Sequence, residues 1–306
     1  MYDMIVIGSG AAGLAAAIYG ARARLSTIII EKQPMSGGQM INTYDVDNYP
    51  GLPGIGGFDL AKNFREHADS LGAQFVTENV RCAELSGDIK KVVTDANVYE
   101  GRTVVIATGA THRKLQIPGE ERLAGMGVSY CATCDGAFFR GKDVAVIGGG
   151  DVALEDALFL ARGCRKVYLI HRRDAFRGAK VLQEKVFATE NIEIMWDTVP
   201  EEIKGEQQVE TLSFLNKKTN EKAEISVQGI FVAVGIEPNT ELFRGMLSLD
   251  EHGYINAGED GVTSVPGVFT AGDVRTKPLR QIITAAADGA NAVSSVERYL
   301  VSEKNA

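Results

Sequence analysis

Short apolar runs that end in glycine turns form the repeating pattern of this chain. The first run, residues 3–7, leads into the turn Gly8-Ser9-Gly10-Ala11-Ala12-Gly13. Residues 14–23 are rich in alanine, whose small side chain lets a helix pack closely on a sheet, and the next apolar run ends at Glu31. This order predicts a strand, a glycine turn, a helix and a second strand, the βαβ unit of dinucleotide-binding folds.

The same pattern recurs in the middle of the chain. Residues 143–147, which are apolar after Asp143, precede the turn 148–153. A helical stretch extends to residue 162, and the strand 166–170 ends at His171-Arg172-Arg173. Glu31 and His171 each lie 23 residues after the first glycine of their turn, Gly8 and Gly148. Because the two copies are in register, the sequence predicts two dinucleotide-binding domains rather than one.

Later segments indicate how these domains are connected. Residues 104–109, 229–235 and 267–273 are apolar runs that end in small residues, and the last precedes a helical stretch with a period close to 3.6. Turn residues gather at 117–119 and 236–239. We expect an α/β fold of two Rossmann-like domains, the second inserted into the first, with residues 1–114 and 241–306 in one and residues 115–240 in the other.

Composition narrows the class of protein. The 306 residues are 45% hydrophobic and 24% charged, as in globular proteins, and the net charge of −8 argues against a nucleic-acid binder. No apolar run approaches the ~18 residues of a membrane span, and the first predicted strand leaves no room for a signal peptide. Only four cysteines occur, at 82, 131, 134 and 164. We therefore expect a cytoplasmic protein without a disulfide scaffold, a membrane segment or a nucleic-acid partner.

The first glycine turn has the features of a dinucleotide fingerprint. Gly8 permits the tight turn, Gly10 lets the backbone approach a pyrophosphate, and Gly13 lets the helix approach the strand. The helix N-terminus offers free amides to the phosphates, and Glu31 stands where a carboxylate can accept hydrogen bonds from a ribose. The alternative is a glycine turn in a nucleotide-free α/β protein, which the register of strand, helix and acid disfavours.

The second turn differs from the first at its acidic position. Ala153 replaces the third glycine, which the fingerprint allows, and basic residues occupy the place of the acid, with Arg177 beyond them. A carboxylate repels a 2′-phosphate, whereas guanidinium groups bind it. We expect a dinucleotide without a 2′-phosphate at the first turn and NADPH at the second. A solvated basic patch after a strand is the alternative.

Cys131 and Cys134 enclose two residues and lie between the two fingerprints. A zinc site needs about four ligands, yet there is no second CxxC and the four histidines are scattered. A permanent disulfide is improbable in a reducing compartment, so reversible redox chemistry is favoured. Asp135 is either a proton donor and acceptor for the thiolates or a cap of a turn or helix.

The remaining cysteines and two aromatic residues lead to simpler expectations. Cys82 and Cys164 have the character of ordinary buried thiols. Phe138 and Phe139 follow the CxxC pair closely, so they form either an exposed docking patch or part of the core.

Taken together, several motifs resemble those of the bacterial-type low-molecular-weight thioredoxin reductases, over essentially the whole chain. These motifs are CATCDG, the two fingerprints in this order, HRRDAFR, ATG at 107–109, AGD at 271–273 and Arg280-Gln281. The resemblance implies tightly held FAD in contact with Gly8, Ser9, Gly10, Ala12, Glu31, Gly38, Gln39, Asn48, Thr108, Gly109, Gly272, Asp273, Arg280 and Gln281. It implies NADPH in contact with Gly148, Gly150, Asp151, Arg172, Arg173 and Arg177, and no metal.

The resemblance also implies roles and an assembly. Cys134 would face the flavin, Cys131 would attack the disulfide of the partner thioredoxin, and Asp135 would be the acid and base. A homodimer is implied, in which the NADPH domain rotates about hinges near residues 117 and 237. Two positions depart from the family pattern: Val152 stands where Ser or Thr is usual, and Gly178 stands in place of Ala.

The sequence therefore predicts an NADPH-dependent flavoprotein that reduces thioredoxin through the Cys131–Cys134 disulfide. Four alternatives remain open. A reductase that feeds a peroxidase system would often carry an extra N-terminal domain, a reductase with ferredoxin as donor should lack the arginines, and a ferredoxin-reducing flavoprotein should lack the dithiol. A non-catalytic redox sensor would bind nucleotides without turning over.

Overall fold

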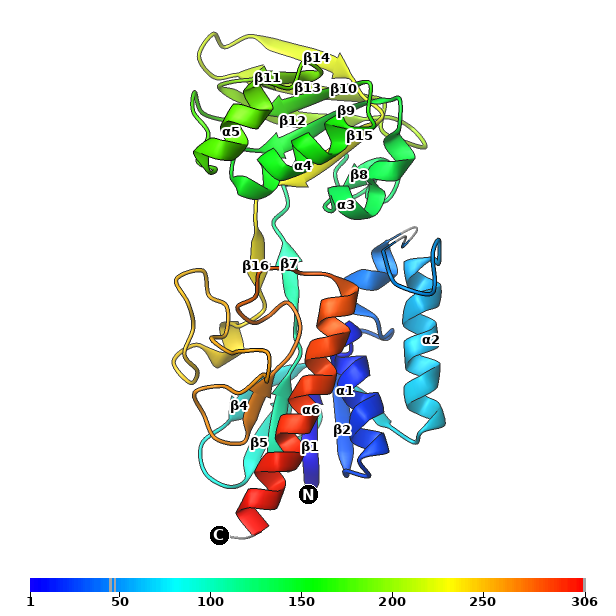
Figure 1. Ribbon diagram of the computed structural model, residues 1–306, viewed down its shortest axis with the longest axis vertical. Helices are drawn as coiled ribbons and strands as arrows, with labels where there is room; N and C mark the ends of the chain where they lie inside the picture. The colour runs from blue at the N-terminus through cyan, green and yellow to red at the C-terminus, as the bar shows by residue number, and fades with distance from the viewer. Residues whose placement is uncertain (44–45, 47, 305–306) are drawn as a thin grey trace. The chain divides into compact units, whose positions relative to one another are not determined.

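A computed structural model describes residues 1–43, 46 and 48–304 of the protein, and its elements are drawn in Figure 1. The chain forms two compact units. The first contains Met1–Asn42, Tyr49–Thr111 and the segment from Glu237 onward, and the second contains His112–Ile236 together with Thr43, Val46 and Asn48. Each unit is built on a sheet of largely parallel strands with helices, so the predicted α/β class is confirmed.

The sheet of the first unit has the strand order β3-β2-β1-β6-β5-β4, and β17 also pairs with β6. The central strands β1, β2, β3, β6 and β17 run parallel, whereas β4 and β5 are antiparallel to their neighbours. The strands are β1 (Tyr2–Ile7), β2 (Thr27–Glu31), β3 (Gln74–Thr77), β4 (Val80–Glu84), β5 (Lys90–Thr94), β6 (Val98–Ile106) and β17 (Val268–Thr270).

Helices and the C-terminal segment bury this sheet. Isoleucine and valine side chains of β1, β2 and β6 form the core with Phe243, Ile255 and Val274. A Cβ at Gly289 of α6 would lie 2.2 Å from the carbonyl oxygen of Ala12 in α1, so these two helices pack with their backbones close together. The helical elements are α1 (Ala11–Arg22), η1 (Gly38–Asn42), α2 (Gly57–Ser70), η3 (Glu241–Phe243) and α6 (Ile282–Lys304).

The second unit repeats the topology. Its parallel sheet has the order β11-β10-β9-β15-β8. Here β9 lies between β10 and β15, just as β1 lies between β2 and β6 in the first unit. In α/β folds such a switch in strand order marks the place, at the carboxyl ends of the strands, where dinucleotides bind. The elements are β8 (Val128–Ser129), β9 (Asp143–Gly148), β10 (Lys166–Ile170), β11 (Ile192–Met195), β15 (Gly229–Ala233), α3 (Ala132–Asp135), η2 (Gly136–Phe139), α4 (Asp151–Ala161) and α5 (Lys180–Phe187).

Alternate residues of these strands enter two different cores, as the pleat of a strand requires. Val144 and Val146 of β9 pack with Leu154 of α4, whereas Ala145 and Ile147 face the apolar side chains of an antiparallel sheet. That sheet consists of β12 (Thr198–Lys204), β13 (Thr211–Asn216) and β14 (Lys222–Ser226). Burial on both faces explains why residues 144–147 form a continuous apolar run in the sequence.

The chain passes between the units twice, through β7 (Ala110–His112) and β16 (Ile236–Pro238). These two strands pair with each other. Among the described residues, no helix is long and apolar enough to cross a membrane.

One expectation about the free thiols is wrong. Cys164 is buried, but Cys82 is exposed. β4 is an edge strand, and its pairing with β5 shifts register between Val80 and Cys82. Such a bulge interrupts the alternation of side chains, so Cys82 faces solvent while Val80 and Ala83 remain buried.

Candidate functional site

The first glycine turn connects β1 to α1. It has no space for a side chain at Gly8 or at Gly13. Gly8 has φ of +100°, and a Cβ there would lie 2.5 Å from the carbonyl oxygen of Ala107. A Cβ at Gly13 would lie 1.9 Å from the carbonyl oxygen of Gly8. Gly10 has open space around its Cβ direction. The turn therefore presents a bare backbone at the N-terminus of α1, as a pyrophosphate requires.

Two substitutions separate folding from nucleotide binding in this turn. We expect Gly13→Ala to lower the free energy of unfolding by about 1–3 kcal/mol or more, because the new methyl group collides with backbone. Gly10→Ala should leave it unchanged to within about 0.5 kcal/mol, yet weaken FAD binding, because its methyl group enters the open space. Urea unfolding of the apoprotein and titration with FAD measure the two effects. Unchanged FAD affinity in Gly10→Ala would contradict the assignment of this turn to the pyrophosphate.

Glu31 is held in a fixed orientation at the end of β2. Its Oε2 atom accepts hydrogen bonds from the backbone N–H and the hydroxyl of Ser9, both at 2.8 Å, and its Oε1 atom accepts one from the N–H of Gln33. Ser9 itself is fully buried. The carboxylate therefore lies beside the glycine turn, in the position expected for a ribose-binding acid.

The segment that contains Gly38 and Gln39 lies against the same turn. The N–H of Gly37 donates to the carbonyl oxygen of Ser9 at 2.8 Å, and a Cβ at Gly38 would lie 3.2 Å from the Cα of Gly10. The side-chain amide of Gln39 donates to the carbonyl oxygen of Ala110. The structure thus brings these predicted FAD residues to the first fingerprint. Asn48 is exposed and is grouped with the second unit, so its assignment stays a prediction.

Thr108 and Gly109 are clamped by Asn239, which the sequence indicated only as part of a turn. The hydroxyl of Thr108 donates to the carbonyl oxygen of Asn239 at 2.8 Å, and the Asn239 amide donates to the carbonyl oxygen of Thr108 at 2.8 Å. The N–H of Asn239 donates to Gly109. Residues 131 positions apart are joined here, and no local pattern could reveal such a pair.

The turn of Gly272 and Asp273 is stabilised by a buried ionic cluster. Asp288 of α6 accepts hydrogen bonds from the N–H of Gly272 at 2.9 Å, from the Arg275 guanidinium and from the Lys277 ammonium. A Cβ at Gly272, whose φ is +83°, would lie 2.8 Å from the Cβ of Ala12. The cluster therefore holds this turn against α1. Sequence reasoning missed Arg275, Lys277 and Asp288.

Two buried polar atoms at this turn lack a partner among the described residues. They are Oδ1 of Asp273 and Nε of Arg280, whose guanidinium lies 4.0 Å from the ring centre of Tyr254. Burial raises the pKa of Asp273, and the nearby Lys277 and Arg280 oppose that rise. Unpartnered buried polar groups are costly and commonly serve a ligand. Together with the open space at Gly10, they fit a flavin dinucleotide.

The second glycine turn, between β9 and α4, has the same construction. A Cβ at Gly148 would lie 2.4 Å from the carbonyl oxygen of Ala233, and Gly150 again has open space. At Gly149 a Cβ would collide with the ring of His171, which is buried and packs against Phe176 and Trp196. His171 is therefore a core residue that supports the turn.

The predicted phosphate-binding arginines follow β10 in an exposed loop. Arg172, Arg173 and Arg177 are exposed, and no ion pair is present for them among the described residues. The backbone N–H of Arg177 donates to the carbonyl oxygen of Gly149 at 2.8 Å, which fixes the loop on the glycine turn. Three uncompensated guanidinium groups beside a dinucleotide fingerprint fit the 2′-phosphate of NADPH.

Asp151 and Gly178 fasten the end of this loop. The Asp151 carboxylate accepts a hydrogen bond from the N–H of Ala179 at 2.6 Å. A Cβ at Gly178 would lie 2.6 Å from Leu154 and 3.2 Å from the backbone nitrogen of Asp151, so glycine permits a close approach to α4. Val152 is exposed in the first turn of α4. Contact of Asp151 with a nucleotide remains a prediction.

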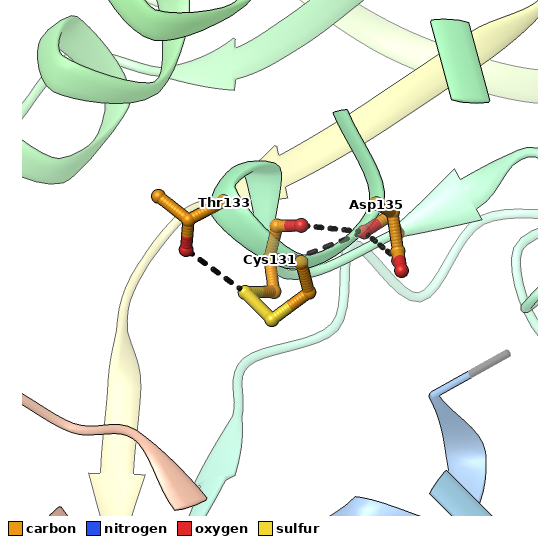
Figure 2. The surroundings of a disulfide bond; sticks show 5 residues. Cys131, Thr133 and Asp135 are labelled. Atoms are coloured by element: carbon orange, nitrogen blue, oxygen red, sulfur yellow. Dashed lines mark hydrogen bonds between the residues drawn. A yellow bond between two sulfur atoms is a disulfide. The ribbon is translucent and has the colours of Figure 1, made fainter. Parts of the chain in front are cut away.

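Cys131 and Cys134 are joined by a disulfide, which confirms the predicted pairing (Figure 2). Cys131 precedes the single turn of α3, and its carbonyl oxygen accepts the N–H groups of Cys134 and Asp135. The hydroxyl of Thr133 lies 3.4 Å from Sγ of Cys131. Both cysteines are partly exposed. No group of metal-ligating side chains occurs among the described residues.

Asp135 is directed at Ser129 and caps nothing. Its Oδ2 atom accepts a hydrogen bond of 2.6 Å from the Ser129 hydroxyl, and the helical turn that follows it receives no side-chain cap. Its Oδ1 atom is buried without a partner among the described residues. Burial raises the pKa of Asp135, and the Ser129 hydrogen bond opposes the rise. A carboxyl group with raised pKa beside a disulfide is suited to proton transfer.

The two phenylalanines after the disulfide have different environments. Phe139 is buried and packs edge to face on Phe231 of the core. Phe138 is 37% exposed. The core interpretation therefore holds for Phe139, whereas Phe138 lies partly at the surface.

Comparison with known proteins gives matches over nearly the whole chain. The model of the family described as pyridine nucleotide-disulphide oxidoreductase matches residues 2–289. The chain is 45% identical to a thioredoxin reductase of Peptoclostridium acidaminophilum, over 98% of this chain and 97% of that protein. The crystal structure of thioredoxin reductase from Streptococcus pyogenes is similar with a TM-score of 0.93 and 45% identity, covering 99% of each chain. A ferredoxin-flavin thioredoxin reductase from Clostridium acetobutylicum has a TM-score of 0.53 and 32% identity over 98% of each chain.

Proposed function

Since the chain belongs to the pyridine nucleotide-disulphide oxidoreductase family, we propose that it is a thioredoxin reductase that uses NADPH as donor and FAD as carrier. The observation that carries the proposal is the Cys131–Cys134 disulfide beside the buried carboxyl group of Asp135. The names of the similar proteins support thioredoxin as the substrate.

FAD would bind in the first unit. Glu31 would accept hydrogen bonds from the ribose, the amides at the start of α1 would bind the pyrophosphate, and the unpartnered atoms of Asp273 and Arg280 would bond the remainder of the cofactor. When bound, FAD would supply the hydride and electron-pair chemistry that links the nicotinamide to the disulfide.

NADPH would bind in the second unit. Its pyrophosphate would lie at the N-terminus of α4, where Gly150 leaves space, and Arg172, Arg173 and Arg177 would bind the 2′-phosphate. These arginines also argue against ferredoxin as the electron donor, because a ferredoxin-dependent reductase has no need of a 2′-phosphate site.

The reduced dithiol would act by disulfide exchange. The Cys131 thiolate attacks one sulfur of the thioredoxin disulfide, a mixed disulfide forms, and the other thioredoxin sulfur leaves as a thiolate. Asp135, protonated at that stage, gives its proton to a departing thiolate. The Cys134 thiolate then attacks Cys131, which reforms the internal disulfide and releases the second thioredoxin sulfur, and solvent supplies the second proton.

An anaerobic titration tests the donor, the carrier and the acceptor in one experiment. We expect the purified protein to be yellow, NADPH to bleach the flavin band, and oxidised thioredoxin to restore it. NADH should be a much poorer reductant because it lacks the 2′-phosphate. If NADPH bleaches the flavin but thioredoxin does not restore it, thioredoxin is not the acceptor; if the protein binds nucleotides but shows no steady-state NADPH oxidation with added thioredoxin, a non-catalytic sensor is the better description.

The resemblance also supports a homodimer in the cytoplasm, with an NADPH domain that rotates about hinges near residues 117 and 237. Sedimentation equilibrium checks the assembly, and a mass equal to one chain would exclude it.

A further inference from the structure

Ser129 joins the two ends of the Cys131–Asp135 segment through one oxygen atom. Its hydroxyl donates to Oδ2 of Asp135 at 2.6 Å, and the same oxygen accepts the backbone N–H of Cys131 at 3.1 Å. Ser129 is 5% exposed and belongs to the edge strand β8, which pairs with β15. The side chain therefore links the carboxyl group of Asp135 and the backbone of Cys131 to a strand of the sheet.

The two carboxyl oxygens of Asp135 differ in their hydrogen bonding. Oδ2 is occupied by Ser129, whereas Oδ1 is buried and has no partner among the described residues. A buried oxygen without a partner is costly, so such an atom is commonly retained for a function.

We propose that Ser129 is a positioning residue of the redox centre: it holds Asp135 by Oδ2, keeps Oδ1 as the oxygen that carries the proton, and sets the proton affinity of the carboxyl group. The inference rests on the proposed function only in that the proton is used to reduce thioredoxin. The geometry on which it depends lies entirely within the second unit.

Neighbouring elements carry other titratable groups, whose titration must be distinguished from that of Asp135. Helix α4 packs on α3, and it carries Glu155 and Asp156, the latter with its pKa raised to about 7 by burial and by Glu155. Tyr130 of the adjoining loop donates to Glu120, and burial raises the pKa of its hydroxyl. Arg140 and Lys142 follow η2. Asp156 therefore titrates near neutrality and would obscure the signal of Asp135.

The sign of the effect follows from the hydrogen bond. A donor to a carboxylate stabilises the ionised form, so the Ser129 hydroxyl lowers the pKa of Asp135 against the rise that burial causes. Removing the hydroxyl should raise that pKa by about one unit, as the loss of one hydrogen bond to a charged group implies.

Infrared titration of the oxidised protein tests the inference without NADPH or thioredoxin. The carboxyl band of Asp135 is identified by its loss in Asp135→Asn, and all variants carry Asp156→Asn so that only one of the two carboxyls remains. We expect Ser129→Ala to move the midpoint of this band upward by about one pH unit. Ser129→Thr, which keeps the hydroxyl, should return it toward the original value. An unmoved midpoint in Ser129→Ala would overturn the inference, and Ser129→Gly serves in its place if Ser129→Ala does not fold.

Thioredoxin reduction supplies a second readout. Because the protonated carboxyl is the active form, activity falls as pH rises through the pKa of Asp135, and Ser129→Ala should shift this fall to higher pH. In the Asp135→Asn background the same replacement should leave the pH profile unchanged; a shift there would refute the assignment to Asp135. If the parent protein reduces no thioredoxin, the proposed function fails, while the infrared result still decides the role of Ser129.

Discussion

Replacing Cys134 with serine should reduce thioredoxin turnover by at least about a thousandfold, while NADPH still bleaches the flavin. A covalent relay stops completely when one of its two sulfurs is absent, so the loss is far larger than that of a single hydrogen bond. The position of the sulfurs in one disulfide, beside Asp135 in Figure 2, is the structural basis of this expectation. Stopped-flow absorbance follows the flavin, and thioredoxin-dependent NADPH oxidation follows turnover.

The two cysteines should fail in different ways. Cys134→Ser retains Cys131 and should accumulate a mixed disulfide with thioredoxin, because the thiol that resolves it is missing. Cys131→Ser should form none, since the attacking thiol itself is lost. Cys82→Ser is the matched control, because Cys82 is an exposed thiol outside the disulfide and should be dispensable. A mixed disulfide that forms only in Cys131→Ser would reverse the assigned order, and persistent turnover in either variant would disprove the relay.

The double variant Arg172→Ala, Arg173→Ala should lose its preference for NADPH over NADH. Each charge-assisted hydrogen bond to a phosphate contributes about 1.5–3 kcal/mol, and 1.4 kcal/mol corresponds to a factor of ten. We therefore expect kcat/KM for NADPH to fall by about a hundredfold or more, while the value for NADH changes little. Initial rates with both nucleotides measure the ratio.

Arg165→Ala is the control for nonspecific loss of positive charge. Arg165 is also an exposed arginine of the second unit, but its guanidinium is already paired with Asp143 at 2.7 Å. It should change neither rate appreciably. A preference that survives in the double variant would show that the 2′-phosphate is bound elsewhere.

Much of the nucleotide sites could be predicted because their requirements are local. The structure agrees with the reasons given for Gly8 and Gly13: a Cβ at either position would lie within 2.5 Å of a backbone oxygen. The 23-residue offset placed Glu31 beside the first turn, since strand, turn and helix have standard lengths. Cys131 and Cys134 are close in sequence, so their pairing needed no tertiary information.

The one expectation that failed, burial of Cys82, depended on packing that the sequence does not show, and so did the environments of His171, Phe138 and Phe139. Cys82 is exposed because a bulge in an edge strand interrupts the alternation, and bulges have no reliable sequence signal. His171 follows a strand like its acidic counterpart Glu31, yet it is buried against Phe176 and Trp196. Phe138 and Phe139 could not be distinguished until the packing of Phe139 on Phe231 was known.

By itself the sequence determined the α/β class, the two fingerprints and the redox pair. Each of these features depends on residues that are close in sequence: the periodicity of a strand or helix, the spacing of glycines, and two cysteines three positions apart. Only the tertiary structure decided which groups complete these sites. Asn239 reaches Thr108 across 131 residues, Asp288 of α6 accepts the N–H of Gly272, and the Ser129 hydroxyl at the end of β8 donates to Asp135 at the end of α3. Hydrogen bonds and burial depend on distance in space, and residue spacing in the chain does not specify that distance.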